Sequence, residues 1–207
     1  MKRALFLALA VAAALTGASR TASDFFANAP EAVVRLLPQS TRLDMVDYFN
    51  YGSKKASENF FGGPARVIAL TDNRIEVQID EDVTMQMAVI PSKTDTIIAV
   101  VTTVAVPARD SSLKFYGSDW QPLKKSPIAA PAYEDWLTKE GRPDFEEISM
   151  LLPFIPASAE FSDDASTLTF RNSAAQYLSA DDFNRLSPKL KDAVVYDINS
   201  GRFTLRK

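Results

Sequence analysis

The sequence predicts an α+β fold in which N-terminal helices pack on an antiparallel sheet of meander hairpins, with a smaller C-terminal lobe of β-hairpin, helix and β-hairpin. Three observations support this prediction. Apolar residues recur at helical spacing up to residue 52. They then alternate with polar residues in successive runs joined by short polar turns. After a proline-rich stretch the alternation returns in two hairpin patterns on either side of a short helix.

Two covering helices are expected before the sheet. Pro30 suits the first position of a helix that Pro38 ends, and the apolar residues between them share a face. The second helix lies in TRLDMVDYFNYG, where Thr41 resembles an N-cap and Gly52 suits the position after the helix end. Both helices have an apolar stripe, so we expect them to dock on the sheet.

The predicted sheet follows from residue 66. RVIAL, 75–79 and 83–89 read as successive strands, and TIIAVVTTVAV is apolar on both faces, as expected of a central strand. Residues 122–156 contain six prolines and form a long connection with one helical turn at YEDWL. The last third resumes as a hairpin, a helix capped by Ser179 and a hairpin turning at residues 199–201. We therefore expect a single domain over 23–207, with 23–125 and 150–207 as its candidate lobes.

The first 22 residues have the pattern of a secretory signal. MKR is a basic start, Ala4 to Leu15 form an apolar core of 12 residues, and small residues follow at 16–19. That core is too short to span a membrane, and the mature chain has no run of about 18 apolar residues, so no transmembrane segment is predicted there. The protein is expected to be exported, to the periplasm or the cell surface.

Composition excludes several chemistries. The chain has no Cys and no His, which removes thiol nucleophiles, Ser-His-Asp catalysis and sites built on thiolate or imidazole ligands. Beyond the predicted leader there are 20 basic and 26 acidic residues, a net charge of −6 with the signs interspersed, so nucleic acid is not an expected partner. No nucleotide-binding glycine motif is present, and no cofactor is predicted.

The stretch RDSSLKFYGSDWQPL, residues 109–123, is the densest group of reactive side chains. Ser111 and Lys114 have the spacing of the Ser-x-x-Lys enzymes, but that chemistry requires both on one helical face. Here the pattern alternates, and a strand would place the two on opposite faces. The stretch predicts a hairpin that either serves as scaffold, with an aromatic pair across its strands, or presents Tyr116, Asp119 and Trp120 as a binding patch.

Other candidate sites are weaker. The acidic turns 80–82 and 163–164 lack the alternate-residue spacing of a Ca²⁺ loop, so no metal site is predicted. The carboxylate pairs 134–135 and 146–147 would suit a glycosidase only if two carboxyl groups converged in a cleft. Residues 111–123 and 166–178 share six of 13 positions, which leaves open a degenerate structural repeat.

Three motifs together resemble a known family. The chain is similar to a Bacteroidetes family of exported proteins classed as a domain of unknown function. The matching residues are Arg42, Leu43, Asp44, Met45, Asp47 and Tyr48; Phe61 to Gly63; and Asp110, Ser111, Phe115, Tyr116, Trp120, Pro122 and Leu123. The resemblance implies secretion and a single α+β unit, and it brings no catalytic residues.

The sequence favours a non-enzymatic binding or accessory module outside the cytoplasm. Its expected partner is a protein, or a glycan recognised by aromatic side chains. The alternative is a carboxylate-based hydrolase, for example one acting on glycans, that uses neither His nor Cys. No catalytic residue is predicted.

Overall fold

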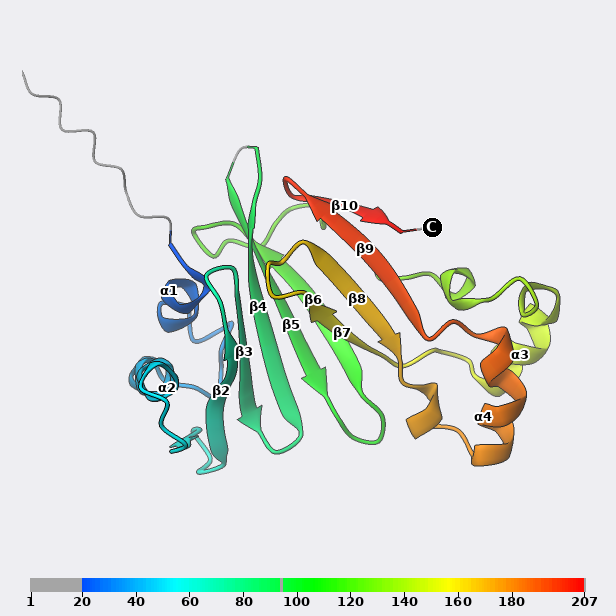
Figure 1. Cartoon of the computed structure of the whole chain (residues 1–207), viewed down its shortest axis with the longest axis horizontal. Coiled ribbons are helices and arrows are strands. Elements are labelled where there is room, and N and C mark those ends of the chain that lie inside the picture. Colours follow the sequence, from blue (N-terminus) through cyan, green and yellow to red (C-terminus); the bar gives the residue numbers. More distant parts are fainter. Residues whose placement is uncertain (1–19, 94, 207) are drawn as a thin grey trace, which may run out of the picture.

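The computed structural model describes residues 20–93 and 95–206, which form three layers (Figure 1). Within these residues a six-stranded antiparallel sheet carries two helices on one face and a four-stranded antiparallel sheet on the other. This architecture confirms the predicted α+β class. None of the helices described is long or apolar enough to cross a membrane.

The larger sheet is a meander in which each strand pairs with the next one along the chain. Its strands are β1 (Ser57–Glu58), β2 (Pro64–Leu70), β3 (Arg74–Asp80), β4 (Val83–Pro91), β5 (Thr96–Val104) and β6 (Asp110–Tyr116). β5 has the two buried faces that its continuous apolar run predicts. Ile98 and Val100 face the helices, whereas Ala99 and Val101 face the smaller sheet.

The first helix begins at the end of the predicted leader, whose boundary at residue 22 stays a prediction. Thr21 is the N-cap of α1 (Ala22–Ala27), where its hydroxyl accepts a hydrogen bond from the Asp24 N–H and Asp24 binds the Thr21 N–H in return. Ala22 is fully buried. Such a capping box stabilises the first turn, so Thr21 belongs to the folded part. Residues 1–19 of the predicted leader lie outside the described residues.

The helix predicted from Pro30 does not form. Residues 30–37, called the strap below, make consecutive turns that cross the helix side of the sheet. Only one bond with the i to i−4 spacing of an α-helix closes there, from the Val34 N–H to the Pro30 carbonyl; the other two, from Val33 to Pro30 and from Leu37 to Val34, span three residues as in a turn. Two prolines eight positions apart, with adjacent valines between them, leave little room for a helix, and burial of Val34 and Leu37 on the sheet decides the conformation.

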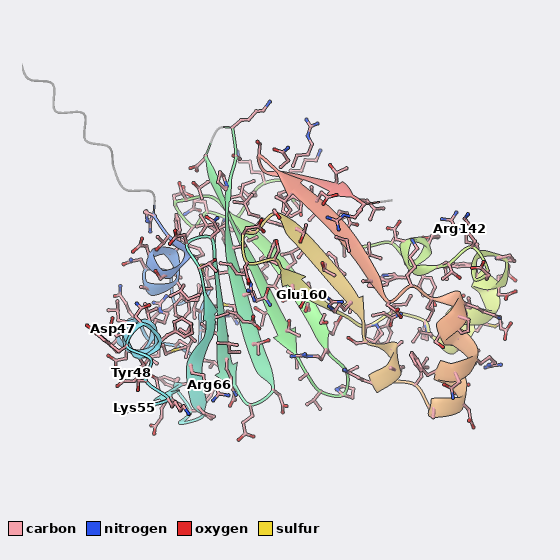
Figure 2. All side chains as sticks on the ribbon, viewed as in Figure 1. Asp47, Tyr48, Lys55, Arg66, Arg142 and Glu160 are labelled. Carbon is pink, nitrogen blue, oxygen red and sulfur yellow. The ribbon has the colours of Figure 1, made fainter. Side chains whose placement is uncertain are left out.

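The second helix, α2 (Gln39–Asn50), confirms the prediction except for its start. Its N-cap is Pro38 rather than Thr41, which lies inside the helix, while Gly52 follows the helix end with a φ of +66° as expected. Figure 2 shows Tyr48 on this helix with Lys55 and Arg66 nearby. The Lys55 ammonium donates to the Tyr48 hydroxyl at 3.1 Å, and this bond raises the pKa of Lys55.

A buried arginine fixes the strap between the two helices. Arg42 is 2% exposed, and its Nη1 donates to the carbonyls of Phe26, at 2.9 Å, and Ala29, at 2.6 Å. The two carbonyls belong to the end of α1 and the residue before the strap. Burial lowers the pKa of Arg42, with nearby Glu31 opposing the shift. The guanidinium therefore determines where the strap leaves α1.

The smaller sheet has the order β10-β9-β8-β7, so its two hairpins join through β8 and β9. Its strands are β7 (Ala157–Phe161), β8 (Thr167–Asn172), β9 (Ala193–Asn199) and β10 (Arg202–Leu205). Between the hairpins lie η3 (Ala174–Gln176), α4 (Ala180–Leu186) and η4 (Ser187–Lys189), as the predicted hairpin–helix–hairpin requires. The connection from β6 contains the expected turn at η1 (Tyr133–Trp136), and also η2 (Arg142–Asp144) and α3 (Phe145–Leu151), which sequence did not predict.

The candidate repeat holds for one strand only. Residues 111–116 and 167–172 are both strands, but a hairpin turn follows the first and the 3₁₀ helix η3 follows the second. In addition, β6 ends the larger sheet whereas β8 lies inside the smaller one. The second half of the match therefore has no structural counterpart.

The two sheets share a core and are joined by hydrogen bonds along β7. Three backbone N–H groups on the outer edge of β7 donate to side chains of the larger sheet: Ala157 to Asp110 (3.2 Å), Ala159 to Ser111 (2.8 Å) and Phe161 to Gln86 (2.9 Å). At one end of the interface Arg74, which is buried, also pairs with Asp163 at 2.5 Å. The three hydrogen bonds give partners to backbone N–H groups on an edge strand that would otherwise have none.

Candidate functional site

The candidate site is a pocket between the strap and the helix-side face of strands β3 to β6. Its volume is about 310 Å³, and its lining comes from five separate segments of the chain. α1 packs on β3 and β4, and α2 packs on β1 and β2. The strap lies over the part of the sheet beyond these helix contacts, so the pocket forms beneath it. Its deep wall is apolar and includes Val34, Met85 and Val100, all buried.

The wall formed by β5 and β6 is polar because of strand alternation. Lys114 is the cross-strand neighbour of Val100, and Ser112 is the neighbour of Thr102. All four side chains line the pocket, so the apolar wall changes to hydroxyl groups and an ammonium group toward the sheet edge. A pocket with an apolar interior and a few convergent polar groups is the usual form of a small-molecule site.

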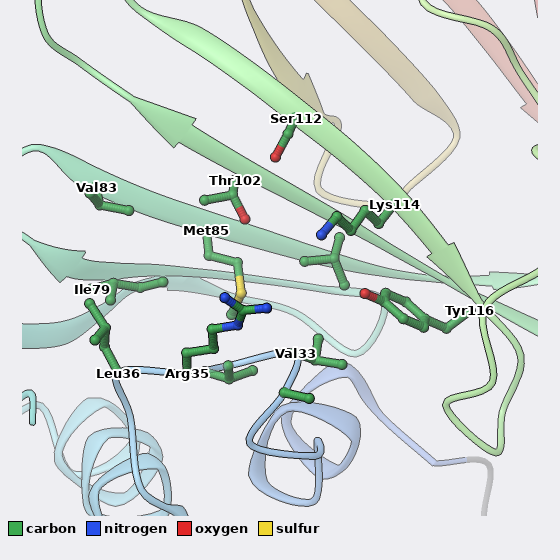
Figure 3. Close-up of a pocket in the computed structure, with 13 residues that line it drawn as sticks. Val33, Arg35, Leu36, Ile79, Val83, Met85, Thr102, Ser112, Lys114 and Tyr116 are labelled. Carbon is green, nitrogen blue, oxygen red and sulfur yellow. The ribbon is translucent and has the colours of Figure 1, made fainter.

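Two cations reach into this space from opposite walls. Figure 3 shows Arg35 extending from the strap and Lys114 extending from β6 toward the interior. Among residues 20–93 and 95–206, neither side chain forms an ion pair. The part of the lining that is described contains no carboxylate. The pocket therefore has an uncompensated positive end.

Of the three residues predicted as a binding patch, Tyr116 lines the pocket. Figure 3 shows its hydroxyl facing the interior, although the residue as a whole is only 9% exposed. Burial raises the pKa of Tyr116, so its hydroxyl is protonated and can donate at neutral pH. Trp120 packs against the Tyr116 ring with centroids 5.6 Å apart and against Phe25 at 6.2 Å, so the predicted aromatic pair forms.

The three residues do not form one exposed surface. Trp120 is half-buried in the core under α1, and its indole nitrogen is covered. Asp119 is exposed, but its carboxylate accepts the Gln121 N–H at 3.0 Å and shapes the turn. The hairpin turn puts Trp120 at a φ of +66°, which folds its ring back onto the sheet. A role of Tyr116, Asp119 and Trp120 in binding stays a prediction, and an exposed aromatic patch does not describe their arrangement.

The Ser-x-x-Lys pair is separated by the strand, as predicted. Lys114 faces the pocket, whereas Ser111 faces β7 and accepts the Ala159 N–H. The Ser111 hydroxyl also lies 2.7 Å from the Thr103 hydroxyl. Ser111 is thus a link between the sheets with no contact to Lys114.

Two of the four carboxylates considered for hydrolysis, which lie in the connection between β6 and β7, already have partners. The Asp135 carboxylate accepts the Ala132 N–H at 2.9 Å. Glu147 lies 3.5 Å from Arg185 and 3.9 Å from Lys189. Across the residues described, no group of three acidic side chains is arranged to hold a metal ion.

Three other hollows contain cations, and their surroundings differ. One of about 190 Å³ lies between α2 and β2 near Lys54, Lys55 and Arg66. There Lys55 already donates a hydrogen bond to Tyr48, and the nearby charge of Asp44 also raises the pKa of Lys55. Another, of about 400 Å³, runs along the outer edge of β6 and is lined only by residues within 113–126. This second hollow shares Lys114 and Tyr116 with the strap pocket. A third, of about 290 Å³, holds Arg142 together with Glu134 and Asp135. The strap pocket differs from these because distant segments converge on it around buried apolar residues.

The sequence analysis missed Arg35. A signal was present, because Arg35 is the one charged residue in the apolar run AVVRLL. In a regular helix that position would be an ordinary solvated one. It becomes part of a pocket because the strap is irregular and lies flat on the sheet.

Comparison with known proteins identifies the family and the fold. Residues 14–203 match the family model described as "Protein of unknown function (DUF3256)". The structure of a domain of an uncharacterized protein from Porphyromonas gingivalis W83 superposes with a TM-score of 0.75 at 24% identity, over 89% of this chain and 96% of that one. The comparison with curated proteins gave no match. These matches confirm the family resemblance carried by the motifs: the chain belongs to the family of proteins of unknown function DUF3256.

Proposed function

We propose that this protein is an exported, non-enzymatic binding protein that holds a small ligand in the strap pocket. The observation that carries the proposal is the lining of that pocket, where a buried apolar wall meets Arg35, Lys114 and three hydroxyl groups. Groups arranged in this way can bind and orient a ligand. Among the described residues the lining has no carboxylate to act as a general base, and the sequence has no His or Cys, so binding is the function that the pocket suits best.

The leader pattern supports a location outside the cytoplasm, in the periplasm or at the cell surface. A basic start followed by 12 apolar residues and small residues is the pattern of an export signal. A protein partner remains compatible with a ligand-binding module. A glycan held by stacked aromatic rings is less favoured, because Tyr116 and Trp120 pack against each other.

The alternative is a carboxylate-based hydrolase. Its best candidates would be the acidic residues of the connection between β6 and β7. Asp135 is engaged by a backbone N–H, and Glu147 lies between two basic side chains, so neither is placed as a free acid or base. The binding role is therefore the stronger proposal.

A pocket-blocking variant tests this function. Ser112→Phe adds a ring to the polar wall of the pocket at an exposed position, and Thr204→Phe adds the same ring at an exposed position on β10. Anilinonaphthalene sulfonate, which fluoresces more strongly in apolar surroundings, serves as probe. We expect saturable binding by the wild type and by Thr204→Phe, and weak binding by Ser112→Phe. Equal titrations for all three proteins would reject the strap pocket as the ligand site.

A further inference from the structure

We infer that the strap pocket takes an amphiphile with a single alkyl chain and an anionic head group, a carboxylate or a phosphate. This inference rests on the proposed binding function and names its ligand class. It is argued from the charge, the hydrogen-bonding groups and the size of the pocket.

The charge of the pocket favours an anion over a neutral or cationic head group. Arg35 and Lys114 both line it, with no carboxylate in the described lining. Two cations of one sign directed into the same hollow repel each other, and a bound anion relieves that repulsion. A carboxylate or phosphate between them would form charge-assisted hydrogen bonds.

The head group belongs at the β6 end of the pocket. The acidic turn 80–82 directly follows Ile79 and precedes Val83, the two lining residues at the far end. An anion placed there would meet like charge. At the β6 end, Lys114 stands beside the hydroxyl groups of Ser112 and Tyr116, which can donate to an oxyanion.

The rest of the ligand must be apolar. From Lys114 the lining continues over Val100 and Met85 to Val83, without a charged group on these strands. Met85 has a flexible thioether side chain that adapts to an alkyl chain of varying shape. A volume of about 310 Å³ is at the lower limit of typical ligand pockets, which span about 300–1,000 Å³, so one alkyl chain fits the pocket better than two.

The test is calorimetric titration with four dodecyl compounds below their micelle concentrations: dodecanoate, dodecyl phosphate, dodecanol and dodecyltrimethylammonium. We expect the two anions to bind the wild type more tightly than the neutral or cationic compound. Either order of carboxylate and phosphate supports the inference and shows which head group the site prefers.

Variants assign the effect to the two cations. Arg35→Gln and Lys114→Gln should each weaken dodecanoate binding roughly tenfold, which corresponds to about 1.4 kcal/mol, and should leave dodecanol binding unchanged. Arg109→Gln and Lys139→Gln are matched controls, because both residues are exposed and lie outside the pocket. Unchanged circular dichroism and urea midpoints would show that the variants are folded.

Two failures can be told apart. If all four compounds bind equally, if the Gln variants have no effect, and if Ser112→Phe still blocks binding, the inferred ligand class is wrong while the binding function stands. If no compound binds and the dye titrations of wild type and Ser112→Phe coincide, the proposed function fails with it.

Discussion

Replacing Arg42 with Leu should destabilise the protein strongly, because the guanidinium holds two buried carbonyls. Its Nη1 donates to Phe26 and Ala29, and the side chain is almost completely buried. Hydrogen bonds from a charged donor contribute about 1.5–3 kcal/mol each, so two of them give about 3–6 kcal/mol. Part of this loss is offset, because Leu avoids the cost of burying a charged guanidinium. The Nε atom of that guanidinium has no hydrogen-bond partner among the described residues. The expected loss in the free energy of unfolding is about 2–4 kcal/mol.

Urea denaturation measures this change. The midpoint should fall while the slope stays constant, as for a change in stability alone. The urea midpoint of Arg42→Lys should lie between those of Arg42→Leu and the wild type, because an ammonium group keeps the charge but lacks the planar, forked donors of a guanidinium. Arg66→Leu, at an exposed position, should change stability by less than about 0.5 kcal/mol. A loss below about 1 kcal/mol for Arg42→Leu would refute the view that this residue anchors the strap.

Three further predictions concern the sheets and one turn. Gln86→Leu removes the acceptor of the Phe161 N–H and should cost about 1–3 kcal/mol of unfolding free energy in the same urea assay. Ser111→Ala should cost about 1 kcal/mol, whereas Ser112→Ala should be neutral in stability, and equal losses would contradict the assignment of their faces. Asp164 has a pKa lowered to about 2 by hydrogen bonds from two serines, so its stabilisation is present above the unfolded pKa near 3.8 and is lost as the pH falls through about 2. The difference in urea midpoint between wild type and Asp164→Asn should therefore shrink between about pH 4 and pH 2, and a difference as large at about pH 2 as at neutral pH would count against this assignment.

The parts of the fold that the sequence predicted are those where one local pattern decides the structure. β2, β3 and β4 alternate clearly, β5 is apolar on both faces, and short turns join the four strands, so their order and their antiparallel pairing followed directly. The hairpin–helix–hairpin lobe was predicted for the same reason. How the two sheets stack was not predictable, because it depends on contacts such as Gln86 with Phe161, which are 75 positions apart.

The strap shows why the candidate site was harder to predict. Its apolar residues have the spacing of a helix, and Pro30 is a reasonable start for one. Long-range packing overrides this preference, because burying Val34 and Leu37 on the sheet stabilises the fold more than an isolated two-turn helix would. In the predicted helix Arg35 would be one more solvated charge, so nothing in the sequence pattern indicated that it shares a pocket with Lys114. Because the strap was predicted as a helix, the part of the pocket that the strap forms was missed.

Strand β6 explains why a stretch dense in reactive groups need not be catalytic. Because side chains alternate along the strand, its two faces have different surroundings. Ser111, Leu113 and Phe115 face the smaller sheet, where they bond to or pack against its strands. Ser112, Lys114 and Tyr116 face the pocket. Groups adjacent in sequence are thereby separated by the full thickness of the sheet, while Lys114 acquires a neighbour, Arg35, from almost 80 residues earlier. The proposed binding site therefore depends on the residues that the strap adds to one face of β6, whereas the other face of β6 holds the two sheets together.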